Sequence, residues 1–209
     1  RQSAVIRLIT RMIFIWFMRE MKLVPSYLFE DDFAREALVN LDQDQSTYYK
    51  AILQNLFFAT LNTKPEERQF RSPITGHKGY NPDFGNHYMY RYQDLFRQPE
   101  KIKAYFDDIT FLNGGLFDCL DDKENGLYVD GFTETKKHQP TVPNQLFFSK
   151  EQTADLNAEF GTSSKTYRIE GLIGILSTYN FTIDENTLDD QDVALDPELL
   201  GKVFENLLA

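Results

Sequence analysis

The sequence predicts a mainly α-helical domain, irregular in form, with long loops and a few short strands or one small hairpin. Helical spacing of apolar residues recurs in several segments, whereas the alternation typical of strands is confined to short ones. The chain of 209 residues is 42% hydrophobic and 14% aromatic, which is enough for a sizeable core. We therefore expect a single domain over residues 1–209, with an inserted loop-rich, aromatic and basic segment at about 64–98.

Three helices are predicted in the first third of the chain. Residues 3–22 are apolar nearly all round, and such a helix is normally covered on most sides by its own protein. Pro25 is expected to end it. A short second helix is predicted over 30–41 and a third over 48–61, where apolar residues recur at helical spacing. The first of these three is the expected centre of the core.

The middle of the chain is predicted to be a surface loop with one short strand. Glycines and prolines interrupt any regular period between Lys64 and Gln98. Tyr88, Tyr90 and Tyr92 alternate, which would place their three rings on one face of a strand. Pro99 is suited to the first position of a following helix.

The second half of the chain is predicted to hold short strands and two further helices. Residues 127–132 and 145–148 are strand candidates that could pair with each other. Residues 166–180 have the spacing of a fourth helix. The final helix spans 196–209, with Asp196 placed to cap its first turn.

This final helix carries an apolar stripe that we expect to meet a neighbouring domain. The chain ends while the helix is still apolar, and it does not begin with methionine. A free terminus is usually polar and poorly packed, so we expect the chain to be an interior piece of a larger protein. The residues of the predicted domain-interface stripe are Leu200, Val203, Phe204 and Leu207.

Charge limits where a nucleic acid could bind. The net charge of −10 argues against a free-standing nucleic-acid binder. Residues 64–103, however, carry 8 basic against 5 acidic side chains, whereas residues 104–209 carry 7 against 20. Basic side chains can neutralise phosphates while neighbouring rings stack on bases; the alternative is a half-buried tyrosine strand beside solvated lysines. The candidate DNA contacts are Arg68, Arg71, Lys78 and Arg91.

Composition favours the cytoplasm. With the single cysteine Cys119, the chain can form no internal disulfide, which is typical of a reducing compartment. The apolar stretch 12–18 is much shorter than the roughly twenty residues that a membrane span needs. We therefore expect a cytoplasmic protein with no membrane contact.

The motifs of common enzyme classes are absent from the sequence. There is no phosphate-binding or dinucleotide-binding glycine loop and no G-x-S-x-G turn. The three histidines lack metal-ligand spacing, and the acidic runs lack the glycine and glutamate positions of a calcium-binding loop. We therefore assign no catalytic, cofactor-binding or metal-binding residue to this chain.

A metal-dependent nuclease is the alternative from another class. Such enzymes use two carboxylates to hold a divalent ion and a lysine near the attacking water. Asp83, which follows Pro82, together with Asp121 and Lys123 matches that loose pattern. A chain this rich in Asp, Glu and Lys produces such matches by chance, so we favour a non-catalytic role.

Five stretches, taken in order, carry a resemblance to a known family. They are RLITRMIFIWFMREMKLVP at 7–25, ILQNLFFATLN at 52–62, FLNGGLFDCLD at 111–121, VPNQLFF at 142–148, and FTIDENT with VALDPELLGKVFENLLA within 181–209. In these stretches the chain resembles the helical region that precedes the methyltransferase domain in type IIG restriction-modification enzymes of bacteria. Related phage-resistance methyltransferases are similar as well.

The resemblance implies a role as a non-catalytic helical connector within a longer enzyme. The full polypeptide would carry an endonuclease, this connector and an adenine-specific methyltransferase, and would bind double-stranded DNA. S-adenosylmethionine and Mg²⁺ are implied for that full enzyme and no cofactor for this segment. An interaction module that recruits a separate methyltransferase subunit is a further alternative.

Overall fold

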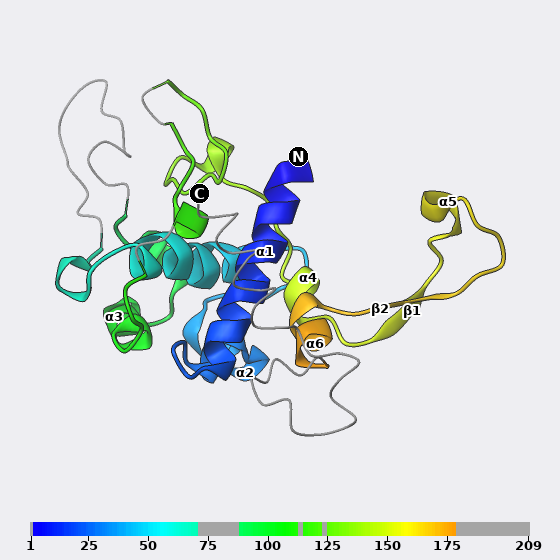
Figure 1. The fold of residues 1–209 in the computed structure, drawn as a ribbon, viewed down its shortest axis with the longest axis horizontal. Coiled ribbons are helices and arrows are strands. Elements are labelled where there is room, and N and C mark those ends of the chain that lie inside the picture. Colours follow the sequence, from blue (N-terminus) through cyan, green and yellow to red (C-terminus); the bar gives the residue numbers. More distant parts are fainter. Residues whose placement is uncertain (1, 71–87, 113–114, 123–124, 179–209) are drawn as a thin grey trace.

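The structure is a computed structural model that describes residues 2–70, 88–112, 115–122 and 125–178. This described part is mainly α-helical with one small antiparallel hairpin, which confirms the predicted fold class (Figure 1). Most of the helices form one body, and the hairpin extends away from it to one side. The assignment of the whole chain to a single domain stays a prediction.

Most of the elements are short. The α-helices are α1 (Gln2–Glu20), α2 (Asp31–Ala37), α3 (Ile102–Phe106), α4 (Gln145–Phe148), α5 (Asn157–Phe160) and α6 (Leu172–Ser177). The strands are β1 (Gln152–Ala154) and β2 (Tyr167–Ile169). The remaining helical segments are η1 (Ser26–Phe29), η2 (Tyr49–Leu61), η3 (Pro65–Glu67), η4 (Gln93–Leu95), η5 (Pro99–Lys101), η6 (Gly115–Phe117) and η7 (Lys136–His138).

Helix α1 confirms the first predicted helix, but its end has a different cause. Lys22 adopts a left-handed conformation with φ of 60°, and the N–H of Leu23 donates to the carbonyl of Met18. This is the Schellman arrangement, which closes a helix before any proline is reached. Pro25 instead precedes η1.

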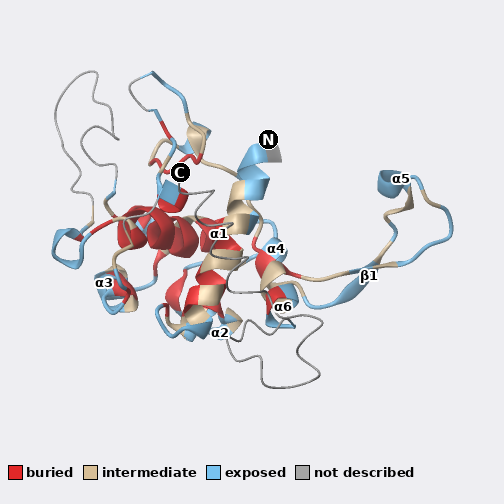
Figure 2. Ribbon diagram, viewed as in Figure 1, coloured by how far each residue is buried: buried red, intermediate tan, exposed pale blue. Residues whose placement is uncertain are grey.

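The predicted all-round burial of α1 holds for only part of the helix. Met12, Ile15 and Trp16 are buried, as expected for the centre of the core. In the first half, Val5 and Ile6 are 55% and 63% exposed. Figure 2 shows this change from exposed to buried along α1.

Helix η2 is the most completely buried element. It has π-helical hydrogen bonding over 13 residues, and Lys50 is its one residue that is not buried. Figure 1 shows η2, in cyan, crossing α1. The crossing is a contact, because the guanidinium of Arg11 on α1 lies over the rings of Phe57 and Phe58 on η2. The third predicted helix is thus confirmed, but as a helix buried on all sides.

Two of the strand predictions were wrong. Residues 145–148 form helix α4, because the preceding Asn144 is fixed by a hydrogen bond from its N–H to the carbonyl of Gln45. Residues 127–132 form no regular strand, because the N–H groups of 129–132 donate to a carboxylate instead of a partner strand.

The hairpin lies in a segment where the sequence predicted a helix. Strands β1 and β2 pair antiparallel, with Thr153 opposite Arg168. The predicted helix over 166–180 is therefore replaced by β2 and the shorter α6. Gly171 separates the two, and its backbone passes so close to α4 that an added Cβ would lie 2.4 Å from the carbonyl oxygen of Phe147.

The three tyrosines do not share a strand face. Tyr92 has φ of 60°, which ends extended structure there, and both Tyr90 and Tyr92 are buried whereas Tyr88 is 42% exposed. The predicted helix start at Pro99 is confirmed by η5 and α3. The second predicted helix is confirmed but shorter, because Leu38 pairs in an isolated bridge with Phe96.

Within the described ranges, no helix has the length and apolar character that a membrane crossing requires.

Candidate functional site

The main concentration of buried charge lies where α1 meets η2 and the segment that follows η6. We call this cluster the buried polar centre and define it by Arg11, Gln54, Tyr92, Asp121 and Asp130. All five side chains are buried or nearly so. A cluster of this kind is the first place to look for chemistry, since functional sites often hold charge out of water.

Arg11 joins three parts of the chain. Its Nε donates to the carbonyl of Leu116 at 2.8 Å and its Nη2 to the carbonyl of Asp118 at 2.9 Å. Its Nη1 donates to Oδ1 of Asp130 at 2.8 Å, and the ring centroid of Phe58 lies 4.9 Å from the guanidinium carbon. The planar guanidinium presents donors in a fixed fork, which suits such a multiply bonded buried position.

The carboxylate of Asp121 is surrounded by backbone N–H groups. Its Oδ1 accepts from Val129, Asp130 and Gly131 at 2.7 to 2.9 Å, and its Oδ2 accepts from Phe132 at 2.8 Å. An ionised carboxylate has about four acceptor positions. Three of these bonds converge on Oδ1 and one reaches Oδ2, so the carboxylate is held in place by the backbone of residues 129–132.

Gln54 and Tyr92 complete the centre through neutral hydrogen bonds. The hydroxyl of Tyr92 donates to Oε1 of Gln54 at 2.8 Å, and Nε2 of Gln54 donates to the carbonyl of Asp130 at 2.8 Å. Burial raises the pKa of Tyr92 well above its ordinary value of 10.0. The tyrosine is thus a neutral hydrogen-bond donor at physiological pH.

Taken together, the contacts of the centre are directed inward, to the protein's own backbone and side chains. Charged groups that are paired in this way hold segments together and are not exposed to a substrate. The first three family-like stretches, 7–25, 52–62 and 111–121, meet at Arg11. In the fourth stretch, the ring of Phe148 lies 4.6 Å from that of Tyr48, which directly precedes η2.

Neither Arg11 nor Asp130 is among the site residues predicted from the sequence. Arg11 directly precedes the apolar stretch 12–18, and Asp130 lies within the strand candidate 127–132. An arginine within an apolar helix is nevertheless a signal, because a buried cation requires an acidic or carbonyl partner. The partner itself lies 119 positions away, and no local pattern identifies it.

Arg68, a predicted DNA contact, lies inside the protein. The residue is 3% exposed, and its guanidinium donates to the carbonyls of Thr60, Thr63, Phe106 and Ile109 at 2.7 to 3.1 Å. These bonds join the end of η2 to the end of α3. They give Arg68 a structural role in the described part of the chain.

Arg91, a second predicted DNA contact, is also buried. Its guanidinium carbon lies 4.8 Å from the ring centroid of Phe132, and its backbone N–H donates to Oδ1 of Asn55 at 2.9 Å. The other two candidates, Arg71 and Lys78, lie outside the described residues.

Several further predictions fall on residues that the structure does not describe. The final helix and its stripe of Leu200, Val203, Phe204 and Leu207 lie there. Of the three residues of the nuclease alternative, Asp83 and Lys123 lie there as well. Among the described residues, no three His, Cys, Asp or Glu side chains lie close enough together to hold a metal ion.

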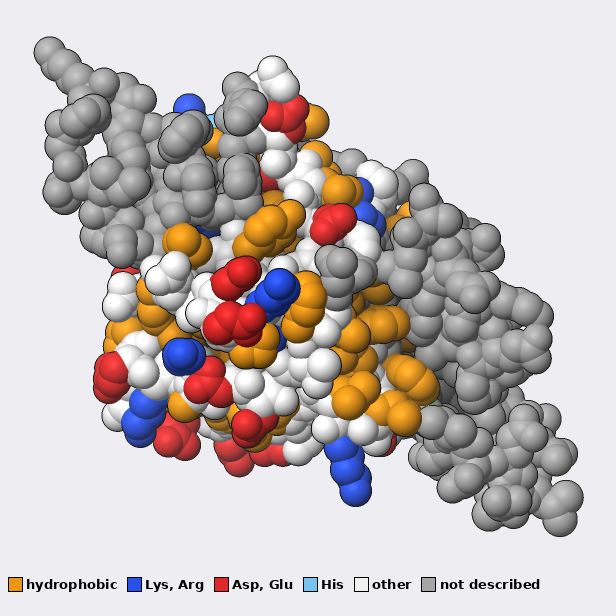
Figure 3. Space-filling model, turned by 60° about the vertical axis from the view of Figure 1, so that its left-hand side comes forward, with side chains coloured by type: hydrophobic (Ala, Val, Ile, Leu, Met, Phe, Trp, Pro, Cys, Tyr) orange, Lys and Arg blue, Asp and Glu red, His pale blue; other side chains and the backbone are white. Residues whose placement is uncertain are grey.

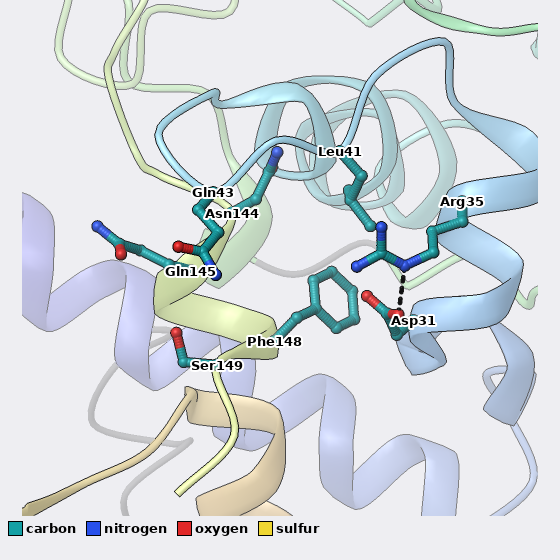
Figure 4. A pocket seen from close by; sticks show the side chains of 8 residues that line it. All are labelled: Asp31, Arg35, Leu41, Gln43, Asn144, Gln145, Phe148 and Ser149. Atoms are coloured by element: carbon teal, nitrogen blue, oxygen red, sulfur yellow. Dashed lines mark hydrogen bonds and ion pairs between the residues drawn. The ribbon is translucent and has the colours of Figure 1, made fainter. Parts of the chain in front are cut away.

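A small hollow lies between α2 and α4. Figure 4 shows the ring of Phe148 pointing into it beside the ion pair of Arg35 and Asp31. Its volume of about 50 Å³ suits a water molecule or two but not an organic substrate, for which about 300 Å³ or more is usual. The lining residues are Asp31, Arg35, Leu41, Gln43, Asn144, Gln145, Phe148 and Ser149.

A larger and more open depression of about 640 Å³ lies beside η3 and α3. Its charged residues are of both signs, since Glu66 and Glu100 lie in the same wall as Lys103. Figure 3 likewise shows a surface on which basic and acidic side chains alternate. On this face the described residues thus form no continuous basic area of the kind that binds a polyanion.

A comparison with known proteins finds similarity to a restriction-modification protein, whereas two other comparisons find nothing. No protein-family model matches the chain, and no solved structure matches it. A protein of Methanocaldococcus jannaschii, provisionally named a type II restriction enzyme and methyltransferase, is 25% identical over 212 residues. The match covers 100% of this chain and 12% of the relative. The chain is therefore similar to one small part of a restriction-modification protein.

Proposed function

We propose that this chain is a non-catalytic helical connector of a restriction-modification protein of the type IIG arrangement. The full polypeptide methylates adenine in a specific DNA site and cleaves DNA that lacks this methylation. The connector packs between the endonuclease and methyltransferase domains and positions them on double-stranded DNA. S-adenosylmethionine and Mg²⁺ serve those domains and not the connector.

This proposal depends on how much of each protein the match covers, which is all of this chain but a small part of the relative. The chain aligns over its full length with 12% of a relative whose name combines restriction and methylation. Most of the relative lies outside the match. The catalytic residues for the two named activities can lie in that part. A segment between two such domains needs a stable core and no catalytic group.

The buried polar centre is compatible with this role. Asp121, the one described residue of the nuclease alternative, already accepts four backbone hydrogen bonds. The guanidinium groups of Arg11 and Arg68 likewise donate to backbone carbonyls of the protein, and that of Arg11 also donates to Asp130. These contacts support a connector that is held rigid by its charged side chains.

Two proteins test the proposal: the isolated chain of 209 residues and the longer polypeptide that contains it. Each is incubated with duplex DNA and radiolabelled S-adenosylmethionine, and separately with duplex DNA and Mg²⁺. We expect methyl transfer to adenine and cleavage from the longer polypeptide and neither from the isolated chain.

Methyl transfer or strand cleavage by the isolated chain would overturn the connector role. A longer polypeptide without either activity would overturn the restriction-modification assignment itself. Activity that appears only when a separate methyltransferase subunit is added would favour the recruiting module instead.

A further inference from the structure

A turn at residues 125 and 126 exposes an asparagine side chain and the peptide nitrogen that follows it. Asn125 and Gly126 are both exposed. Gly126 has φ of 72°, a left-handed conformation that suits a residue without Cβ. Asp122 and Leu127 pair in an isolated bridge, with the N–H of Leu127 2.8 Å from the carbonyl oxygen of Asp122. The turn is therefore closed by a defined contact although its two residues face water.

An asparagine that precedes glycine can react with its own backbone. The peptide nitrogen of the glycine attacks the side-chain carbonyl carbon, and a succinimide ring forms. The ring closure is favoured because one chain holds both reacting groups, and glycine leaves the attacking nitrogen without a neighbouring side chain. The reaction requires an asparagine side chain that can rotate and a glycine N–H that is not held in a hydrogen bond.

Gly126 meets the second requirement. Within the described ranges, no group accepts a hydrogen bond from its N–H. A Cβ added at Gly126 would have no atom within 4 Å, so the space around this residue is open. The nitrogen is thus available for attack on the side chain of Asn125, and water can reach the product.

The fold prevents the same reaction at a second pair of this kind. Aspartate undergoes the same ring closure, and Asp130 precedes Gly131, which also has a positive φ of 64°. There the N–H of Gly131 donates to Oδ1 of Asp121 at 2.9 Å. The carboxylate of Asp130 is held by Arg11 at 2.8 Å. Tertiary contacts, and not the local sequence, therefore distinguish the two pairs.

One hydrogen bond holds the side chain of Asn125 away from ring closure. Its Nδ2 donates to Oδ2 of Asp122 at 2.7 Å, and its backbone N–H donates to Oδ1 at 3.1 Å. The first of these bonds has to break when the side chain turns toward Gly126. Asp122 is exposed, so water competes for its oxygens and the restraint is partial.

We propose that Asn125 is a site of spontaneous deamidation in the folded protein, and that Asp122 restrains the reaction. The nitrogen of Gly126 bonds to Cγ of Asn125, the bond between Cγ and Nδ2 breaks, and Nδ2 leaves as ammonia with the proton from Gly126. Water then opens the succinimide to aspartate or isoaspartate. The reaction consumes only water, and no other domain takes part, so this inference is independent of the proposed function.

The product loosens the turn. A carboxylate at position 125 replaces the donor Nδ2 by an acceptor that faces the carboxylate of Asp122, and the two like charges repel each other. Isoaspartate also lengthens the backbone between Asp122 and Leu127. The same segment connects Asp121 to the N–H groups of 129–132 that surround its carboxylate. The N–H of Leu127 is therefore expected to exchange with solvent faster after deamidation.

The test follows the full-length polypeptide during incubation in a mildly alkaline buffer without denaturant. Peptide mapping by mass spectrometry measures the conversion of amide to acid at each asparagine. The matched control in the same chain is Asn40, which is also exposed and donates through Nδ2 to Asp42 at 2.8 Å, but precedes leucine. We expect conversion at Asn125 and none at Asn40 over the same period.

Trypsin separates this site from another asparagine that precedes glycine. Asn113 lies outside the described residues, and cleavage after Lys123 places it in a different peptide from Asn125. Fragmentation of the second peptide distinguishes a change at position 125 from one at Asp130. Each conversion is thus assigned to a single residue.

Three variants test the geometry. Asn125→Gln keeps the amide and the charge, but its longer side chain does not form the succinimide, so conversion at this position is expected to be lost. Asp122→Ala frees Nδ2 and is expected to speed conversion about fivefold, which is the factor that corresponds to one net hydrogen bond. Asn125→Asp reproduces one product and is expected to show faster hydrogen exchange in the peptide that contains Leu127.

An amide that persists at Asn125 in the folded polypeptide overturns the inference, and so does equal conversion at Asn40. Conversion that occurs only after urea is added overturns it as well, because the site would then belong to the unfolded chain. A rate that is unchanged or lower in Asp122→Ala overturns the restraint by Asp122. Unchanged hydrogen exchange in Asn125→Asp overturns the loosening of the turn.

Discussion

Arg11 and Asp130 form an ion pair between side chains that are 2% and 5% exposed, with Nη1 of the arginine 2.8 Å from Oδ1 of the aspartate. Asp130 also accepts the N–H of Leu120 at 2.9 Å through its other oxygen. The pair connects α1 to a segment more than a hundred positions further along the chain. Burial of both charges makes the fold depend on each of them.

Replacement of Arg11 by methionine is expected to lower the free energy of unfolding by about 3–5 kcal/mol, because the buried carboxylate of Asp130 then keeps only the more distant cation of Arg7, whose Nη2 lies 3.9 Å from Oδ1. Urea denaturation followed by circular dichroism measures this change. The control is Arg35→Met, which removes an exposed pair with Asp31 one helical turn away and is expected to cost about 0.3–0.5 kcal/mol. Equal effects of the two substitutions would contradict the structural role of the Arg11 pair.

Substitution of Asp121 tests whether its carboxylate has a structural or a catalytic role, and substitution of the neighbouring Asp122 serves as the control. Asp121→Asn replaces one acceptor oxygen by a donor facing backbone N–H groups, and the expected loss of stability is about 2–3 kcal/mol. In the full-length polypeptide, cleavage and methyl transfer per folded molecule are expected to change by the same factor. The nuclease alternative instead requires loss of cleavage with methyl transfer retained.

The matched control is Asp122→Asn. This carboxylate is exposed and accepts from the backbone and side chain of Asn125. A surface change of this kind is usually worth less than about 0.5 kcal/mol. Comparable destabilisation by both variants would show that the hydrogen bonds to Asp121 are not the cause.

The elements that could be predicted from the sequence are those defined by local patterns. Helix α1 follows from its apolar length, and η5 and α3 follow from Pro99 and the apolar spacing after it. Within η2 the apolar run predicts a helix. The same run could not predict that the helix is buried on every side, since that depends on segments distant in the chain.

The elements that could not be predicted depend on partners far away in sequence. The strand prediction for residues 127–132 was wrong because the N–H groups of 129–132 donate to Asp121. Residues 166–180 have helical spacing, yet Tyr167–Ile169 pair with β1. In the candidate site, the sequence identifies Arg68 as a basic residue that could bind phosphate. That its guanidinium instead donates to backbone carbonyls follows only from the tertiary structure.

Three buried tyrosines predict a loss of stability in alkali. Burial raises the pKa of Tyr48, Tyr49 and Tyr92 above the ordinary value of 10.0. The folded protein therefore holds these protons more tightly than the unfolded chain. The contribution is fully present below the unfolded pKa near 10 and is lost as the pH rises above it, by up to about 1.4 kcal/mol per pH unit for each tyrosine.

Urea midpoints measured from about pH 8 to about pH 11 test this dependence, with tyrosinate absorbance recorded in parallel. The absorbance of the buried tyrosines is expected to appear only with unfolding. Tyr92→Phe removes one titrating group and is expected to reduce the slope above pH 10 by about 1.4 kcal/mol per pH unit. A slope unchanged in this variant would contradict the assignment of Tyr92.

Arg68 and the two basic residues that follow it are expected to behave differently in DNA binding. Arg68→Lys cannot reproduce the hydrogen bonds to several carbonyls, so the variant is expected to lose about 2–3 kcal/mol of stability while folded protein keeps its affinity for DNA. Arg71→Ala and Lys78→Ala are instead expected to weaken DNA binding by the full-length polypeptide uniformly across sequences. Each is expected to reduce the slope of log affinity against log salt by about one, as the loss of one phosphate contact does.

Fluorescence anisotropy with duplex DNA at several salt concentrations measures both the affinity and this slope. If Arg71→Ala and Lys78→Ala leave affinity and slope unchanged, DNA contact by this segment is excluded, because a phosphate-bound cation cannot be removed without release of fewer counterions.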